Sequence, residues 1–195
     1  MAEANLVAVE FLARQARARG VTDVLWRGTL WTPHAVPEYF TSDFEVVLEV
    51  GGTDYFLIET DGQSGHIRIW HYLTAAELVA HHWDYGDEGV QEEVGLVRMG
   101  FPFLGSRRNV RCVRAYHRSW EHDPARQDVV TCFVLCFDVG ASLQFDAEYI
   151  DGIKLDFLPA GWSPPDAACL GVWNGTNRRT ASTSSPSSAI GRSKG

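Results

Sequence analysis

The segment Phe44–Thr60, which reads FEVVLEVGGTDYFLIET, decides the fold, because two runs of strand-forming residues flank a Gly-Gly pair. Such a pair between β-rich runs is typical of a hairpin with a two-residue loop. In that register the numbers of paired residues add up to 103, so Glu49 faces Asp54. Glu45 lies on the same face, because alternate residues of a strand share a face. The segment therefore predicts an antiparallel hairpin with three carboxylates on one side.

The sequence on either side of this hairpin predicts two helices. An apolar stripe runs through residues 4–19, and Gly20 is suited to end that helix. Thr74-Ala-Ala-Glu77 is a capping box, in which the Thr and Glu side chains bind free backbone N–H groups of the first helical turn. We expect a short helix from this box to about Trp83, and we assign the Thr and the Glu no other role.

Apolar and alternating runs predict further strands in the second half of the chain. Val129–Phe137 is almost continuously apolar, which is typical of a central strand buried on both faces. Residues 142–149 and 153–158 alternate around an Asp-Gly pair. A three-residue loop at positions 150–152 keeps their apolar residues on one face, and it places Asp146 opposite Asp156.

Together these patterns predict a single α+β domain at residues 1–165. Its mainly antiparallel sheet has six to eight strands, and the N-terminal helix and the short capped helix pack on that sheet. Residues 166–195 are expected to form a Ser/Thr-rich disordered tail. The reason is that residues 174–195 contain six Ser, three Thr and almost no apolar side chains to bury.

The composition narrows the classes of function. Asp and Glu total 25 against 17 Lys and Arg, a net charge of −8, which disfavours nucleic-acid binding. No apolar run approaches the ~20 residues that a membrane-spanning helix needs. The four cysteines form no CxxC pair, and the acidic N-terminus lacks the features of a secretion signal. We therefore expect free thiols and a cytoplasmic protein that binds no membrane.

Charge is distributed unevenly along the chain. Pro37–Glu93 contains 13 acidic residues and one base, Arg68, whereas Arg98–Arg126 contains seven arginines and two acidic residues. One interpretation is that an acidic surface meets a basic partner protein. The other is that the two segments attract each other within one domain. The sequence leaves both interpretations open.

A small-ligand or peptide-binding module is an alternative function. Its binding site would be an aromatic-lined interior, although aromatic residues also build ordinary cores. The tryptophans expected to line it are Trp26, Trp31, Trp70 and Trp83.

A hydrolase or a metal enzyme is the third class. It would use His81, His82 and Asp84, or two carboxylates that share a proton, Asp146 and Asp156. The chain contains no P-loop, no GxGxxG and no GxSxG sequence that would organise such groups into a mechanism.

The charge pattern favours a non-enzymatic protein that uses an acidic sheet face to bind a basic partner, without a cofactor or a metal ion. Small acidic inhibitor and immunity proteins have this general profile, which is an analogy of type and not a sequence match. The predicted contact residues are carboxylates of the hairpin and of the segment after the capped helix: Glu45, Glu49, Asp54, Asp84, Asp87 and Glu88.

Overall fold

The structure, a computed structural model, describes residues 2–31, 38–60, 65–80, 93–98, 107–118, 129–148, 152–159, 161–165 and 167–174. In these ranges the chain forms two helices and ten strands. The strands make two antiparallel sheets of five strands each. No helix in the described ranges is long and apolar enough to cross a membrane.

The first half of the chain forms the first sheet and both helices. Its elements are α1 (Ala2–Arg19), β1 (Val21–Trp31), β2 (Glu38–Val50), β3 (Asp54–Thr60), β4 (Ile67–Tyr72), α2 (Ala75–Val79) and β5 (Glu93–Arg98). The strand order is β4-β3-β2-β1-β5, so β1 to β4 form a meander and β5 pairs with the other side of β1.

The second half forms the second sheet. Its strands are β6 (Val110–Arg118), β7 (Cys132–Phe137), β8 (Ala141–Glu148), β9 (Gly152–Pro159) and β10 (Ala167–Asn174). The strand order is β10-β6-β7-β8-β9, so β6 to β9 form a meander and β10 pairs with the other side of β6.

The two sheets therefore share one topology, a four-stranded meander whose fifth strand returns beside the first. The fourth and fifth strands lie at opposite edges, so the connection between them has to cross the sheet. In the first sheet this connection contains α2, whose Leu78 packs against Leu25, Val47 and Leu57. In the second sheet it contains Trp162, which packs against a separate buried cluster. Each connection covers part of the face that points away from the core, which we call the outer face.

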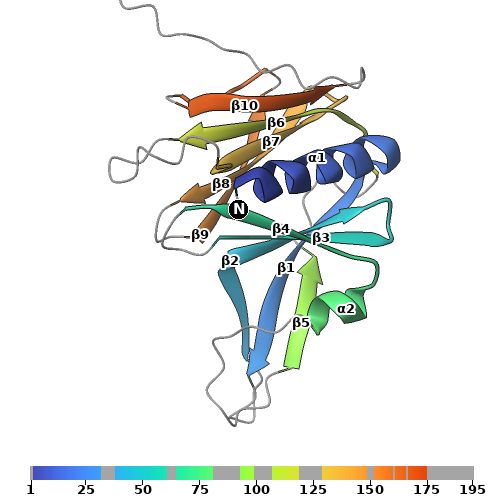
Figure 1. The fold of residues 1–195 in the computed structure, drawn as a ribbon. Helices are drawn as coiled ribbons and strands as arrows, with labels where there is room; N and C mark the ends of the chain where they lie inside the picture. Colours follow the sequence, from blue (N-terminus) through green and yellow to red (C-terminus); the bar gives the residue numbers. More distant parts are fainter. Residues whose placement is uncertain are drawn as a thin grey trace, which may run out of the picture.

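The helix α1 lies between the two sheets and completes their shared core (Figure 1). It contacts β2 and β4 of the first sheet, and β6 and β10 of the second. Its buried stripe consists of Val9, Leu12, Ala13 and Ala16. These residues pack with apolar side chains from the inner faces of both sheets, which include Leu48, Phe56, Phe133 and Phe145.

Three predicted elements are confirmed. α1 ends at Arg19, and Gly20 follows with a φ of 75° while its N–H donates to the carbonyl of Ala16. Thr74 and Glu77 form the predicted capping box, but α2 ends at Val79, before the expected end at about Trp83. β7, which comes from the apolar run, is the central strand of its sheet and is buried along its whole length.

The mainly antiparallel character is also as predicted, but the number of sheets is not. Two sheets of five strands replace the single sheet of six to eight, because each meander has its own apolar inner face and the two faces close over α1. The folded part extends beyond residue 165, since β10 pairs with β6 and Trp173 is only 9% exposed in the shared core. Residues 175–195 lie outside the described residues.

The hairpin of β8 and β9 has its loop one residue earlier than expected. Glu148 pairs with Gly152, so Asp146 faces Lys154, and Asp156 faces Gln144. The expected register is wrong by two residues, which preserves the apolar face but separates the two aspartates. Gly152, with a φ of 94°, already belongs to the strand and does not close the loop.

We predict that Trp173→Ala destabilises the protein by about 3 kcal/mol, because it removes a large side chain from the core that both sheets share. An exposed apolar residue in the β7–β8 turn of the same sheet provides the control: Val139 is 55% exposed, and Val139→Ala should change the free energy of unfolding by less than about 0.5 kcal/mol. Urea denaturation of both variants measures the difference. Equal effects of the two substitutions would contradict the packing of β10.

Candidate functional sites

The hairpin of β2 and β3 has a three-residue loop, which changes the face of one predicted carboxylate. Val50 pairs with Asp54, and Glu49 pairs with Tyr55. Asp54 therefore lies on the inner side of the sheet and Glu49 on the outer side. The prediction that Glu45, Glu49 and Asp54 share one face is wrong.

Glu45 and Glu49 lie on the outer face of the first sheet, but both are buried and paired. Their side chains are only 4% and 7% exposed. Arg27 Nη1 lies 3.1 Å from Glu45 Oε2, with both side chains buried. Glu49 accepts a hydrogen bond from Thr22 Oγ1 at 2.7 Å and lies 3.6 Å from Arg98 Nη2. Because buried charges are costly without partners, these contacts account for both carboxylates within the fold.

Other charges on the same outer face are paired across strands in the same way. Arg98 of β5 forms an ion pair with Asp23 of β1. Glu59 accepts a hydrogen bond from Trp70 Nε1 at 2.8 Å and lies 3.9 Å from Arg68 Nη1. The acidic segment is thus partly neutralised inside the domain, by arginines that come from β1 and β5 as well as β4.

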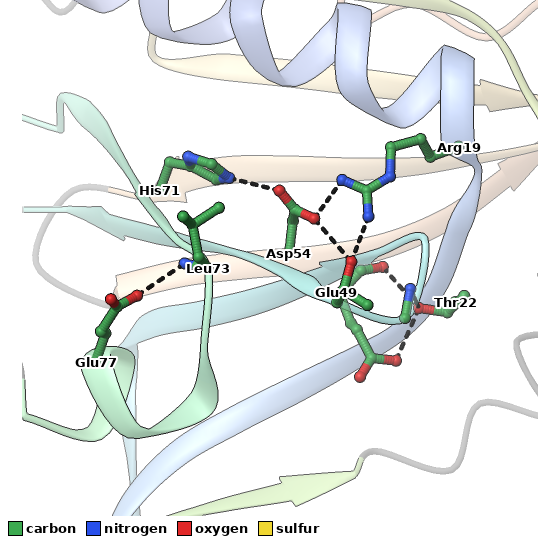
Figure 2. Close-up of polar contacts among 9 residues, drawn as sticks. Arg19, Thr22, Glu49, Asp54, His71, Leu73 and Glu77 are labelled. Carbon is green, nitrogen blue, oxygen red and sulfur yellow. Dashed lines mark hydrogen bonds and ion pairs between the residues drawn. The ribbon is translucent and has the colours of Figure 1, made fainter.

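Asp54 is the centre of a polar cluster at the end of α1 (Figure 2). One carboxylate oxygen accepts from Arg19 of α1, which also donates to Thr53. The other oxygen lies 2.9 Å from His71 Nε2 of β4. The cluster therefore connects α1, the start of β3 and the end of β4.

The imidazole of His71 is held by packing as well as by Asp54. Its ring centroid lies 5.1 Å from that of Phe11 and 4.7 Å from that of Phe56. A carboxylate that binds a histidine ring nitrogen can orient the ring for proton transfer. Here the same carboxylate also binds a guanidinium, so the cluster as described orients α1 on the first sheet.

The electrostatics of Asp54 favour its charged form. Burial alone would raise the pKa of this carboxyl, but hydrogen bonds from His71, Arg19 and Thr53 outweigh burial and lower the pKa. A lowered pKa in the folded state stabilises the fold above the pKa of the unfolded state. That contribution is lost as the pH falls through the folded pKa.

We predict that Asp54→Asn lowers the free energy of unfolding by about 1–2 kcal/mol at pH 7, because it removes the carboxylate charge to which Arg19 and His71 bind. The deficit should shrink as the pH falls below about 3.8, because the Asp54 carboxyl of the unfolded chain then takes up a proton more readily than that of the folded chain. Urea denaturation at pH 7 and pH 3 checks both points, with the exposed helix residue variant Glu10→Gln as control. A deficit that is constant between the two pH values would contradict the role of the charge.

Two glycines in the hairpin loop differ in their surroundings. Gly51 and Gly52 have φ values of 63° and 75°, a region that favours glycine. A Cβ on Gly51 would lie 2.7 Å from Nε of Arg19, whereas a Cβ on Gly52 would have no neighbour within 4 Å. The Gly51 N–H also donates to the carbonyl of Gly20 at 2.9 Å. The Arg19 side chain thus extends across Gly51 to Asp54, and a side chain at position 51 would occupy its path.

We predict that Gly52→Ala costs about 1 kcal/mol, through the left-handed backbone alone. Gly51→Ala should cost more, because the added methyl group also displaces Arg19 from Asp54. Thermal unfolding of both variants, alone and combined with Asp54→Asn, measures the excess. The excess should disappear in the Asp54→Asn background, and its persistence there would contradict this account.

Of the alternative-site residues that the structure describes, neither the two tryptophans nor the two aspartates lie together. Trp26 packs against the shared core, whereas Trp70 is 44% exposed on the outer face of the first sheet. They therefore line no common interior. Asp146 accepts from Gln144 Nε2 at 2.7 Å and lies 3.0 Å from Arg118 Nη2, and it does not face Asp156.

Several predicted site residues lie outside the described residues. They include the proposed contact carboxylates of the segment after α2 and the candidate metal ligands beside them: Asp84, Asp87, Glu88, His81 and His82, together with Trp83. The side chain of Trp31 is likewise not described. Among the side chains that the structure does describe, no three His, Cys, Asp or Glu groups are placed to hold a metal ion.

The cysteines gather on the outer face of the second sheet. All four are free thiols, and they lie in or beside the buried cluster that Trp162 covers. Cys112 of β6 pairs directly with Cys136 of β7. Cys132 pairs with Tyr116 on one side and Asp146 on the other, and Cys169 also pairs with Tyr116.

The opposed thiols differ in their tendency to ionise. A hydrogen bond from the Cys136 thiol, together with the charge of Arg114, lowers the pKa of Cys112 to about 6 against the effect of burial. The same contact raises the pKa of Cys136. Burial raises the pKa of Cys132. The directions of the two shifts favour ionisation of Cys112 over ionisation of Cys136.

Sequence reasoning missed the partners in these clusters. Arg19, Arg27 and Arg98 lie far from their carboxylates in sequence, and only the strand order brings them close. The Cys112–Cys136 pair was likewise invisible without the register of β6 and β7. The register of the β2–β3 hairpin could have been predicted from its apolar residues. A three-residue loop is the one that places all four of them on the same buried face: Val46, Leu48, Phe56 and Ile58.

Comparisons of this chain with known proteins found no relative. No protein-family model, no curated protein and no solved structure matches the chain. The function has to be inferred from the chain itself.

Proposed function

We propose that the protein is a non-enzymatic binding protein that captures a basic partner protein on the side of the first sheet where α2 lies. The observation that carries the proposal is an excess of acidic residues in the connection from α2 to β5. Between His81 and Glu93 the sequence has five acidic residues and no Lys or Arg: Asp84, Asp87, Glu88, Glu92 and Glu93. Electrostatic attraction of this kind accelerates association with a cationic partner.

The acidic residues proposed to bind the partner lie in this connection and not in the β2–β3 hairpin. Glu45, Glu49 and Asp54 are buried and have cationic partners within the fold, so they are not offered to another protein. The predicted contact residues that remain are Asp84, Asp87 and Glu88.

Exposed apolar side chains next to α2 support the same location. Trp70 of β4 is 44% exposed and Leu73, which follows that strand, is 64% exposed. Tryptophan is enriched among the residues that dominate binding energy in interfaces. In the proposed function, Trp70 supplies an anchor for affinity, and the acidic residues that follow α2 in the sequence supply charge for steering.

Capture from an extract of the source cells tests the proposal. We expect one basic protein to bind in stoichiometric amount to the wild-type chain. The double variant Asp84→Asn/Asp87→Asn should associate with that protein at least several-fold more slowly, and the difference should shrink as salt rises, because screening acts over about 8–10 Å at ordinary ionic strength. Surface plasmon resonance with the purified partner measures the rates.

A matched control removes the same charge elsewhere. Glu10 and Asp138 are exposed on α1 and on the β7–β8 turn. The variant Glu10→Gln/Asp138→Asn should associate at nearly the wild-type rate. Equal slowing by both double variants, or the lack of any stoichiometric basic partner, would contradict the proposal. Trp70→Ala should raise the dissociation rate and leave the salt dependence unchanged.

A further inference from the structure

The outer face of the second sheet carries two thiols in direct opposition. Across the strands β10, β6, β7 and β8, one row of paired residues runs Asn174, Cys112, Cys136 and Ser142. This site lies on the other sheet from the proposed partner surface, so it does not rest on the proposed function.

Cross-strand opposition suits a disulfide. Directly opposed residues of antiparallel strands have Cα atoms about 4.5–5.5 Å apart, within the ~4.4–6.8 Å that a disulfide requires. The other cysteines are farther away. Cys132 is four residues from Cys136 along β7, which is about 13 Å at ~3.3 Å per residue, and Cys169 is two strands away from β7. Cys112 and Cys136 are thus the one pair of the four that can close without moving strands.

The surroundings of the pair suit thiol exchange. Cys112 is half-buried, and reactive cysteines are typically accessible thiols beside cationic groups. Arg114 lies two residues along β6 on the same face, where its Nη1 contacts the carbonyl of Trp162 at 3.5 Å. A register shift lies between Val110 and Cys112, next to the pair, and such bulges redirect side chains beside functional groups.

We propose that Cys112 and Cys136 form a redox-active dithiol that reacts with a small disulfide such as glutathione disulfide and closes to a cross-strand disulfide. Cys112 is the attacking thiol and Cys136 is the resolving thiol. The other two cysteines take no part.

The reaction balances in two exchange steps. The Cys112 thiolate attacks one sulfur of glutathione disulfide, whose S–S bond breaks and releases one glutathione thiolate. That thiolate takes the proton of Cys136. The Cys136 thiolate then attacks the sulfur of Cys112 in the mixed disulfide and expels the second glutathione thiolate, which takes up from solvent the proton that Cys112 lost when it ionised. Two cysteine thiols are oxidised and one glutathione disulfide is reduced to two glutathione molecules.

Equilibration of the purified full chain in glutathione buffers, from fully reduced to fully oxidised, tests the proposal. Free thiols are blocked with N-ethylmaleimide, and peptides are mapped by mass spectrometry. We expect two of the four thiols to be lost in oxidising buffer, with a Cys112–Cys136 linkage within one chain. An unlinked chain in the most oxidising buffer, a linkage to Cys132 or Cys169, or a linkage between two chains would overturn the proposal.

Single serine variants separate the two roles. Cys136→Ser should accumulate glutathione on Cys112, because no resolving thiol remains, whereas Cys112→Ser should accumulate several-fold less on Cys136. Cys169→Ser is the matched control and should form the disulfide at the wild-type rate. Equal glutathione uptake by the first two variants would overturn the assignment of the attacking thiol, and circular dichroism verifies that each variant is folded.

The pH profile of alkylation provides a second readout. The rate at which iodoacetamide modifies Cys112 is followed between pH 5 and pH 9 in the wild type, in Cys136→Ser and in Arg114→Gln. We expect a wild-type midpoint about two units below the ~8.5 of free cysteine. The midpoint should rise in Cys136→Ser and in Arg114→Gln. A wild-type midpoint at the value of free cysteine would contradict the proposed activation.

Discussion

One shared core is the constraint on which the rest of the structure depends. Two five-stranded sheets each have a single apolar inner face, and neither sheet can cover its own inner face. The helix α1 fills the space between them, with Val9, Leu12, Ala13 and Ala16 fully buried. Because the inner faces and this helix bury one another, the polar clusters lie on the outer faces, apart from the Asp54 cluster beside the end of α1. The clusters that can carry function therefore lie on the outer faces and around the ends of α1.

The repeated topology determines what happens on those outer faces. A fifth strand that returns beside the first obliges each connection to cross its sheet, and α2 and Trp162 cover the faces that they cross. Covering a face buries the polar groups on it, and a buried charge requires a partner. The Arg27–Glu45 ion pair satisfies this requirement on the first sheet, and the Arg118–Asp146 ion pair satisfies it on the second. Buried polar chemistry on both sheets thus follows from strand order.

The sequence was sufficient for local structure and insufficient for pairing. The N-terminal helix, the Thr74–Glu77 capping box and the apolar central strand depend on neighbouring residues, and all three are confirmed. Register depends on the length of a loop, and a Gly-Gly pair fits loops of two or three residues. A difference of one residue exchanges the two faces of a strand, and this moved Asp54 to the inner side. The strand β10 escaped detection because a single residue, Trp173, contributes its largest contact with the core.

Cross-strand pairing also explains why charge counted along a segment overstates the charge that a surface presents. The acidic residues from Pro37 to Glu93 have one base among them, yet Arg27 and Arg98 reach Glu45 and Glu49 because β1 lies beside β2 and β5 beside β1. The proposed function relies instead on the connection after α2, where the sequence itself has five acidic residues and no Lys or Arg between His81 and Glu93. The same rule places Cys136 opposite Cys112, two thiols that are 24 positions apart in the sequence. In this chain the ion pairs and the thiol pair depend on which strands lie side by side, and no short sequence motif encodes strand order.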